Sequence, residues 1–149
     1  MLLLIDGYNL LTTIEAALAG AVVLRCRDDS VRDIAALHGT WRQVAETSPA
    51  ADLIGQTLQD LGVGHARWYL DSPVSNSGRL AGLLRLIGME HCWKWTVDLV
   101  PDPDPLLAAQ PDPVATADSI ILDGCQAWLN LAALVIERHV PGARIVDLR

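Results

Sequence analysis

The sequence of 149 residues lacks several features that define whole classes of protein. It has no phenylalanine. Its three cysteines form no C-x-x-C pair, so we expect neither a disulfide framework nor a zinc site. No uncharged apolar run approaches the roughly 18 residues that a membrane span requires. Because unpaired, widely spaced cysteines are typical of a reducing compartment, we expect a cytoplasmic protein with no membrane partner.

Basic residues are also scarce, with 11 Lys and Arg against 18 Asp and Glu and a net charge of −7. This balance argues against a broad basic face for nucleic acid. It leaves open an enzyme that reaches phosphates through a bound metal. Of the 18 acids, 14 are aspartate, a residue that favours caps, turns and loops. Much of the negative charge should therefore lie at the ends of helices and strands.

The apolar content of 51% is enough for one core, and we expect residues 1–149 to form a single domain. Short apolar runs typical of strands occupy residues 2–5, 21–24, 66–70, 93–100, 114–116 and 144–148. Helical spacing occurs between them at residues 10–18, 48–61, 77–87, 119–125 and 128–138, and a short helix is expected to end at Leu37. Residues 101–113, rich in proline, predict a stiff exposed loop. The alternation predicts an α/β fold with a mostly parallel sheet covered on both faces.

Aspartates follow three of the predicted strands. Asp6 and Asp71 come directly after strands, and Asp118 lies two residues past Thr116. Because sites in parallel sheets form at the carboxyl ends of the strands, we expect the three carboxylates to meet there. They would repel one another unless a cation lay between them. The sequence therefore predicts a Mg²⁺ site suited to the attack of water on a phosphodiester.

Other residues near the same strand ends are weaker candidates. Asp123 is a secondary candidate for a metal ligand. On one helix, five residues would place it about 140° around the axis from Asp118, so the two side chains would not share a face. Arg79 follows the Asp71 loop and suits a forked contact with phosphate. Small polar side chains that could support the site are Asn9, Ser75, Asn76, Ser77 and Thr116. Taken singly, each acid is more simply a turn or helix cap, so the prediction depends on the group.

Three segments carry a resemblance to a known superfamily. The opening Leu3-Leu4-Ile5-Asp6-Gly7-Tyr8-Asn9-Leu10-Leu11 resembles that of PIN-like and NYN-type nuclease domains. Thr116-Ala117-Asp118-Ser119 resembles their late T-x-D-S element. The segment from Leu70 to Arg79 is similar to the middle acidic loop of a poorly characterised PIN-like family. The resemblance covers most of the chain, from Leu2 to about Val146.

The resemblance implies a three-layer α/β/α sandwich and cleavage of RNA that depends on Mg²⁺ or Mn²⁺. Asp6, Asp71 and Asp118 would then be the metal ligands, with Asn9 and Thr116 as supporting polar groups. Many PIN nucleases take a further acid, often Glu, from a helix in the middle of the chain. Here Glu46 is the only Glu near the middle, in a stretch with little helical spacing. Whether Asp123 or Glu46 supplies a fourth acid stays open.

Two functions follow from these observations. The first is a metal-dependent ribonuclease, a hydrolase acting on phosphodiester bonds, with RNA favoured over DNA. The second is a non-catalytic binding or regulatory module of the same fold, with a degenerate site. The last helix, at residues 128–138, is apolar enough to serve an interface with a second copy or another protein. A phosphatase with an aspartyl nucleophile is disfavoured, because its usual second Asp would stand where Tyr8 is found.

Overall fold

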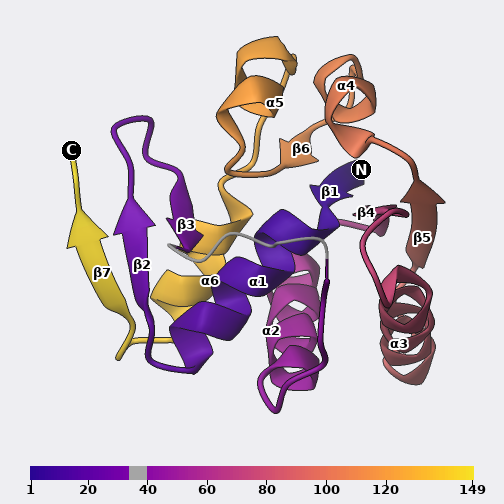
Figure 1. Cartoon of the computed structure of the whole chain (residues 1–149), viewed down its shortest axis with the longest axis horizontal. Coiled ribbons are helices and arrows are strands. Elements are labelled where there is room, and N and C mark those ends of the chain that lie inside the picture. The colour runs from indigo at the N-terminus through magenta and orange to yellow at the C-terminus, as the bar shows by residue number, and fades with distance from the viewer. Residues whose placement is uncertain (34–39) are drawn as a thin grey trace.

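A central sheet of four parallel strands organises the molecule. The computed structural model describes residues 1–33 and 40–149. The sheet has the order β5-β4-β1-β6 (Figure 1). Its strands are β1 (Leu2–Asp6), β4 (His65–Asp71), β5 (Trp95–Val100) and β6 (Val114–Ala115). All four carboxyl ends therefore lie at one edge of the sheet.

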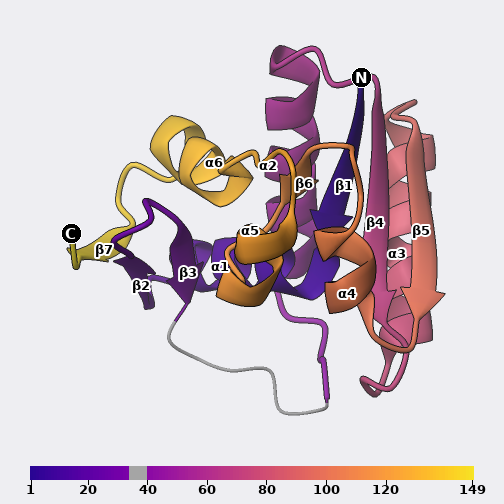
Figure 2. The same cartoon turned by 90° about the horizontal axis from the view of Figure 1, so that it is seen from above.

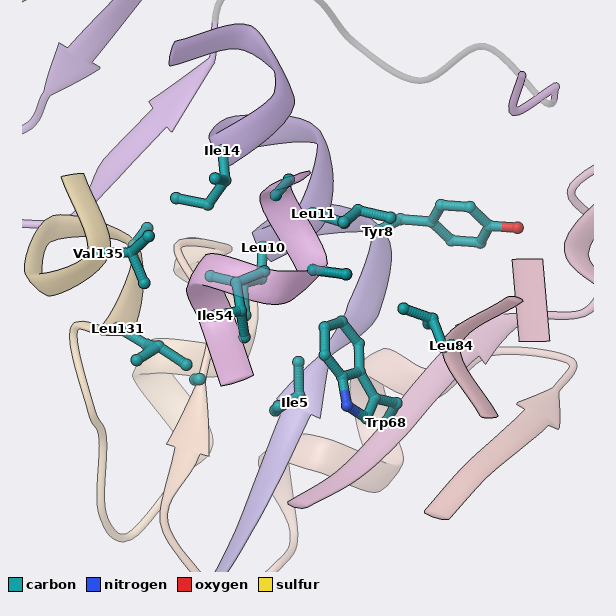
Figure 3. Packing of buried hydrophobic residues seen from close by; sticks show 14 of the residues in the cluster. Ile5, Tyr8, Leu10, Leu11, Ile14, Ile54, Trp68, Leu84, Leu131 and Val135 are labelled. Atoms are coloured by element: carbon teal, nitrogen blue, oxygen red, sulfur yellow. The ribbon is translucent and has the colours of Figure 1, made fainter. Parts of the chain in front are cut away.

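Side chains alternate between the two faces of this sheet, as the pleat of a strand requires. Leu3, Ile5 and Trp68 face the larger apolar cluster, part of which Figure 3 shows. Leu4 and Tyr69 face the opposite way, into a smaller cluster. The sheet is thus buried on both faces, which explains the nearly continuous apolar run at the start of the chain.

Helices cover both faces (Figure 2). The larger cluster is shared with α1 (Gly7–Leu18), α2 (Thr47–Asp60), α3 (Ser77–Glu90) and α6 (Leu131–His139). The smaller cluster is shared with α4 (Pro103–Ala108) and α5 (Ser119–Gly124). The predicted α/β/α sandwich with a mostly parallel central sheet is confirmed. Among the described residues, no helix has both the length and the apolar character needed to cross a membrane.

A second sheet of three strands lies beside the first. In it β2 (Val22–Arg25) pairs with antiparallel β3 (Val31–Asp33) and with parallel β7 (Arg144–Asp147). The prediction of a short helix ending at Leu37 is wrong for residues 31–33, which form β3. The rest of that predicted helix lies outside the described residues. The chain reverses instead at a turn in which Asp28 Oδ1 accepts hydrogen bonds from the Ser30 amide and hydroxyl.

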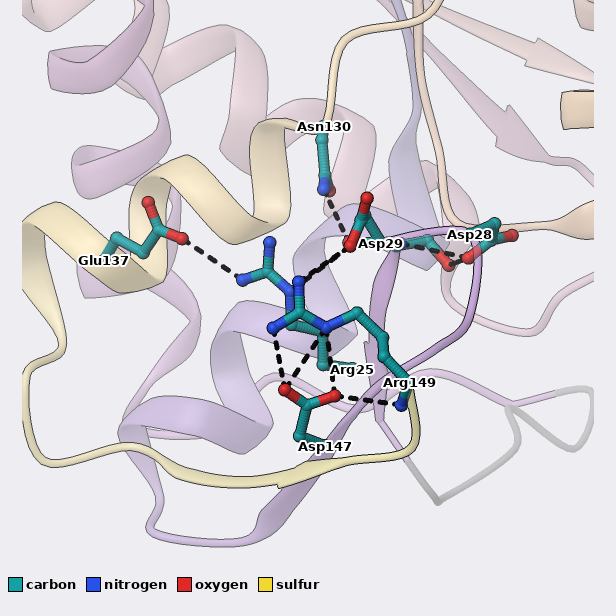
Figure 4. Close-up of polar contacts among 8 residues, drawn as sticks. Arg25, Asp28, Asp29, Asn130, Glu137, Asp147 and Arg149 are labelled. Carbon is teal, nitrogen blue, oxygen red and sulfur yellow. Dashed lines mark hydrogen bonds and ion pairs between the residues drawn. The ribbon is translucent and has the colours of Figure 1, made fainter.

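Polar contacts tie this second sheet to α6 (Figure 4). Arg25 Nη1 lies 3.2 Å from Glu137 Oε1 on α6. Arg149 lies 2.7 Å from Asp147 and 2.9 Å from Asp29. These pairs are exposed and screened by solvent, and they join β2 to α6 and the residue after β7 to the turn that follows β2.

The proline-rich stretch is not the exposed loop that its composition predicts. Pro103 begins α4 at a position where its missing N–H costs nothing. Asp102 caps the helix by accepting a hydrogen bond from the Asp104 amide at 3.3 Å. Pro103 and Leu107 are buried. The stretch thus forms part of a covering layer of the sheet and carries its acids toward the strand ends.

Candidate functional site

Carboxylates gather at the carboxyl edge of the central sheet. Asp6 is the last residue of β1, and Asp71 is the last residue of β4. Asp118 follows β6, and Asp104 lies on α4, just after β5. The charges of Asp71, Asp104 and Asp118 all raise the pKa of Asp6. Acids at or just after the ends of the four parallel strands therefore lie within electrostatic reach of Asp6.

Asp6 lies at the centre of this group and is only 6% exposed. Burial is the main reason that its pKa is raised from 3.8 to about 7. The hydroxyl of Thr116 donates a hydrogen bond of 2.7 Å to Asp6 Oδ2, which opposes the rise. The pKa of this carboxyl therefore lies close to neutral pH, and a nearby cation would favour loss of its proton.

Thr116 and Asn9 hold the loop that follows β6. Thr116 Oγ1 accepts a hydrogen bond of 3.0 Å from the Asp118 amide while it donates to Asp6. Asn9 Oδ1 accepts a hydrogen bond of 2.8 Å from the Ala117 amide. The Trp128 indole donates to the Thr116 carbonyl at 2.8 Å. These contacts fix the backbone that carries Asp118, so Thr116 and Asn9 lie where supporting groups were expected.

Asp71 and Asp104 are half-buried, and both have raised pKa values. Burial is the largest cause for each. The charge of Asp102 raises the pKa of Asp71 further, and those of Asp118, Asp102 and Asp71 raise that of Asp104. Asp104 was not among the candidates, because it lies in residues 101–113, which the sequence predicts as an exposed loop. The signal was present, because Asp102 and Asp104 follow a predicted strand just as Asp71 does.

The donor chemistry of this edge suits a hard divalent cation. Among the residues that the structure describes, no three His, Cys, Asp or Glu side chains lie close enough to hold a metal ion as they stand. The side chains of Asp6, Asp71, Asp104 and Asp118 nevertheless supply only oxygen ligands, which Mg²⁺ and Mn²⁺ prefer. A cation would relieve the mutual repulsion that raises the pKa of Asp6. The residues fit such an ion in chemistry and in sign of charge.

The polar residues after β4 make structural contacts. The Ser75 carbonyl accepts a hydrogen bond of 3.2 Å from the Trp41 amide. Asn76 has a φ of 69° and donates through Nδ2 to the Trp41 carbonyl at 2.9 Å. Ser77 Oγ donates to the Ser72 carbonyl at 3.2 Å. The expected supporting role of these three residues is thus indirect: they shape the loop after Asp71 and anchor the buried Trp41 beneath it.

The remaining candidates lie apart from the acids of the sheet edge. Asp123 is exposed and lines a separate cavity of about 300 Å³ together with Asp28 and Trp128. Glu46 stands at the N-cap position of α2 without a side-chain cap hydrogen bond. Its charge adds to burial, the main cause, in raising the pKa of Glu15. Arg79 is exposed in the first turn of α3, beyond the Asp71 loop. The structure therefore brings together Asp6, Asp71 and Asp118, adds Asp104, and places Asp123 and Glu46 elsewhere.

Comparison with known proteins places the chain in a family. It belongs to the family described as Domain of unknown function (DUF5616), which matches residues 1–134. It is 31% identical over 135 residues to Uncharacterized protein MJ0935 of Methanocaldococcus jannaschii. That match covers 89% of this chain and 64% of the relative, so the chain spans less than two thirds of the relative's length. No solved structure matches.

Proposed function

We propose that this chain is a metal-dependent nuclease of PIN-like type that hydrolyses phosphodiester bonds in RNA, with Mg²⁺ or Mn²⁺ as cofactor. The observation that carries the proposal is that Asp71, Asp104 and Asp118 lie at or just after the ends of three strands parallel to β1, and that their charges act on the buried Asp6 at the end of β1. Repelling charges in a partly buried place are costly unless a cation or substrate uses them. The resemblance of residues 3–11 and 116–119 to PIN-like nucleases supports the choice of reaction.

Each residue has a distinct task in this proposal. Asp6, Asp71 and Asp118 would hold the cation, with Asp104 close by as a further acid. When bound, the ion would polarise a phosphoryl oxygen and lower the pKa of an attacking water. Thr116 orients Asp6 and favours its ionised form through the hydrogen bond to Oδ2. Arg79 is exposed and could contact a phosphate of the bound strand.

The net charge of −7 shapes the expected substrate binding. An acidic protein gains little from general attraction to the phosphate backbone, so affinity should depend on the bound cation. We therefore propose RNA as the substrate, alone or delivered by a protein partner or a second copy of the chain. The three free cysteines support the proposed location in the cytoplasm.

Calorimetric titration with Mn²⁺ tests the proposal without a known substrate. We expect saturable binding by the wild type, and an affinity at least about a hundredfold lower in Asp6→Asn and Asp118→Asn, since each loses a ligand charge. The matched control is Asp123→Asn, which removes a charge five residues from Asp118 but in another cavity. This variant should bind Mn²⁺ like the wild type.

A cleavage assay then separates the two functions. Fluorescent single-stranded RNA and DNA of the same sequence are incubated with Mn²⁺ and each variant, and the titration is repeated with a short uncleavable oligonucleotide. Binding of Mn²⁺ that is lost in Asp6→Asn, together with cleavage of RNA, supports the nuclease. The absence of a ready-made metal cluster among the described residues favours the alternative, a non-catalytic module. Wild-type protein that binds no Mn²⁺, even with oligonucleotide present, would select that alternative.

A further inference from the structure

A cavity of about 240 Å³ lies at the amino edge of the central sheet. Its walls come from the last turns of α2, from the turn before β4, and from the residues at which β4 and β5 begin. This edge is opposite to the one at which β1 and β4 end in Asp6 and Asp71. The cavity is therefore separate from the acids of the proposed metal site, and none of those acids lines it.

The indole of Trp93 forms one wall and is held in place from several sides. Gly55 on α2 leaves room for this ring, because a Cβ atom at that position would overlap it. Trp93 Nε1 donates a hydrogen bond of 3.4 Å to Gln59 Oε1. The imidazole of His91 stacks on the indole at 4.1 Å between ring centroids, and its Nε2 lies 3.2 Å from Asp52 Oδ1 on α2. The wall is thus already formed without a ligand, as in most small-molecule sites.

The other walls are largely apolar. Trp95 lies 5.2 Å from Trp93 between ring centroids, and Leu58 and Ala66 are buried. An apolar cavity of about 150 Å³ holds benzene, and pockets for drug-sized molecules begin at about 300 Å³. The volume therefore suits a molecule of one ring or two fused rings. Two indole walls favour a flat aromatic ring, because aromatic rings gain from contacts with one another beyond the area that they bury.

Lys94 gives the cavity a positive charge. It is the single lysine of the chain, and it alone is charged among the described residues that line the cavity. Within residues 1–33 and 40–149 its ammonium group forms no ion pair. The Ala66 amide donates a hydrogen bond of 3.1 Å to the Lys94 carbonyl, which fixes the lysine backbone against β4. A cation without a partner beside an apolar cavity favours a ligand that carries an anionic group.

We propose that this cavity binds a small aromatic carboxylate, whose ring contacts Trp93 and Trp95 and whose carboxylate pairs with Lys94. The site is independent of the proposed cleavage of RNA, because it lies at the opposite edge of the sheet and needs no metal. Its test therefore gives no information on the nuclease proposal, and either proposal can fail alone.

Calorimetric titration with phenylacetate and with its neutral amide, phenylacetamide, tests ring and charge separately. We expect the wild type to bind phenylacetate about threefold to fivefold more tightly than the amide, and Lys94→Gln to bind both alike, as for a partly exposed ion pair. Trp93→Leu should weaken binding of both probes by about threefold to tenfold, because it loses the aromatic contact. The matched control is Arg138→Gln, which removes a positive charge from exposed α6 and should leave both affinities unchanged.

A second measurement needs no variant. In protein labelled with ¹⁵N at the tryptophan indoles, phenylacetate should shift the signals of Trp93 and Trp95 and leave those of Trp41 and Trp128 in place. Neither probe binding at millimolar concentration, or shifts confined to Trp41 and Trp128, would overturn the site. Equal affinities of the wild type for the carboxylate and the amide would overturn the recognition of an anionic group by Lys94.

Discussion

Two buried carboxyl groups lie near opposite ends of α1, and their surroundings differ. Asp6 precedes the helix, and Glu15 lies in its second half. Burial raises the pKa of both groups, and one threonine hydroxyl opposes the rise in each case: Thr116 for Asp6 and Thr47 for Glu15. Thr47 donates its hydrogen bond to Glu15 Oε2.

The neighbours decide what each acid can do. Glu15 is 9% exposed and lies against Thr47, which is fully buried and donates a hydrogen bond to it. Asp6 has Asp71, Asp104 and Asp118 around it, and all three are partly exposed. A buried acid with a raised pKa is therefore not enough to indicate a site. Two acids, Glu46 and Asp33, also raise the pKa of Glu15, whereas three raise that of Asp6. The distinguishing feature of Asp6 is that its neighbouring acids lie at or just after the ends of parallel strands.

The largest expected effect concerns the pH dependence of stability. The folded-state pKa of Asp6 lies above its unfolded value, so folding binds a proton, and stability falls as the pH rises from about 4 to about 7. Three pKa units correspond to roughly 4 kcal/mol. Relative to the wild type, metal-free Asp6→Asn should therefore gain up to about 4 kcal/mol of unfolding free energy between pH 4 and pH 8. Urea unfolding at both pH values measures the gain.

Glu15→Gln is the matched partner of this variant. Its gain should have the same sign, because burial also raises the pKa of Glu15. Mn²⁺ should separate the two acids: it should stabilise the wild type and Glu15→Gln at pH 8 but leave Asp6→Asn unchanged. Equal responses of all three proteins to Mn²⁺ would remove the distinction drawn between the two acids.

An intermediate effect is expected for the two hydroxyl donors. Thr116→Val and Thr47→Val each remove a hydrogen bond to a buried carboxyl group, and bonds to charged groups contribute about 1.5 to 3 kcal/mol. Both variants should lose stability by about this amount at pH 8. Because Thr116 lowers the pKa of Asp6, its loss should move that pKa above 7, measurable by NMR titration of labelled aspartate. Thr47→Val should leave Asp6 and the affinity for Mn²⁺ unchanged.

Much of the central sheet could be predicted from the sequence, because apolar runs and helical spacing report burial directly. The strand ends at Asp6 and Asp71 were predicted for this reason. The strand at residues 31–33 was missed because it is too short to show a period, and only its pairing with β2 defines it. The six-residue helix α4 was missed because prolines suggest a loop, although Pro103 stands where a helix tolerates it.

The candidate site was predictable only in part. The rule that acids follow parallel strands found Asp6, Asp71 and Asp118. It would also have found Asp104 if the sequence had predicted that α4 follows β5 directly. Helical spacing from Asp118 could not show that Asp123 lines another cavity, because that depends on how α5 packs.

The smallest expected effect tests whether Asp104 belongs with Asp6 or only lies near it. Of the three aspartates whose charges raise the pKa of Asp6, Asp104 has the largest effect. Asp104→Asn should therefore lower that pKa and ease release of the proton. A divalent cation, however, loses more attraction from the missing charge than it gains from easier deprotonation. We therefore expect Mn²⁺ affinity to fall about fivefold to tenfold, or roughly 1 to 1.4 kcal/mol, as measured by calorimetry. Asp112→Asn, a change after α4 that leaves the edge acids intact, is the control and should not alter binding. Unchanged affinity in Asp104→Asn would confine the site to Asp6, Asp71 and Asp118, and the acids after β5 would then serve only to cap and solvate α4.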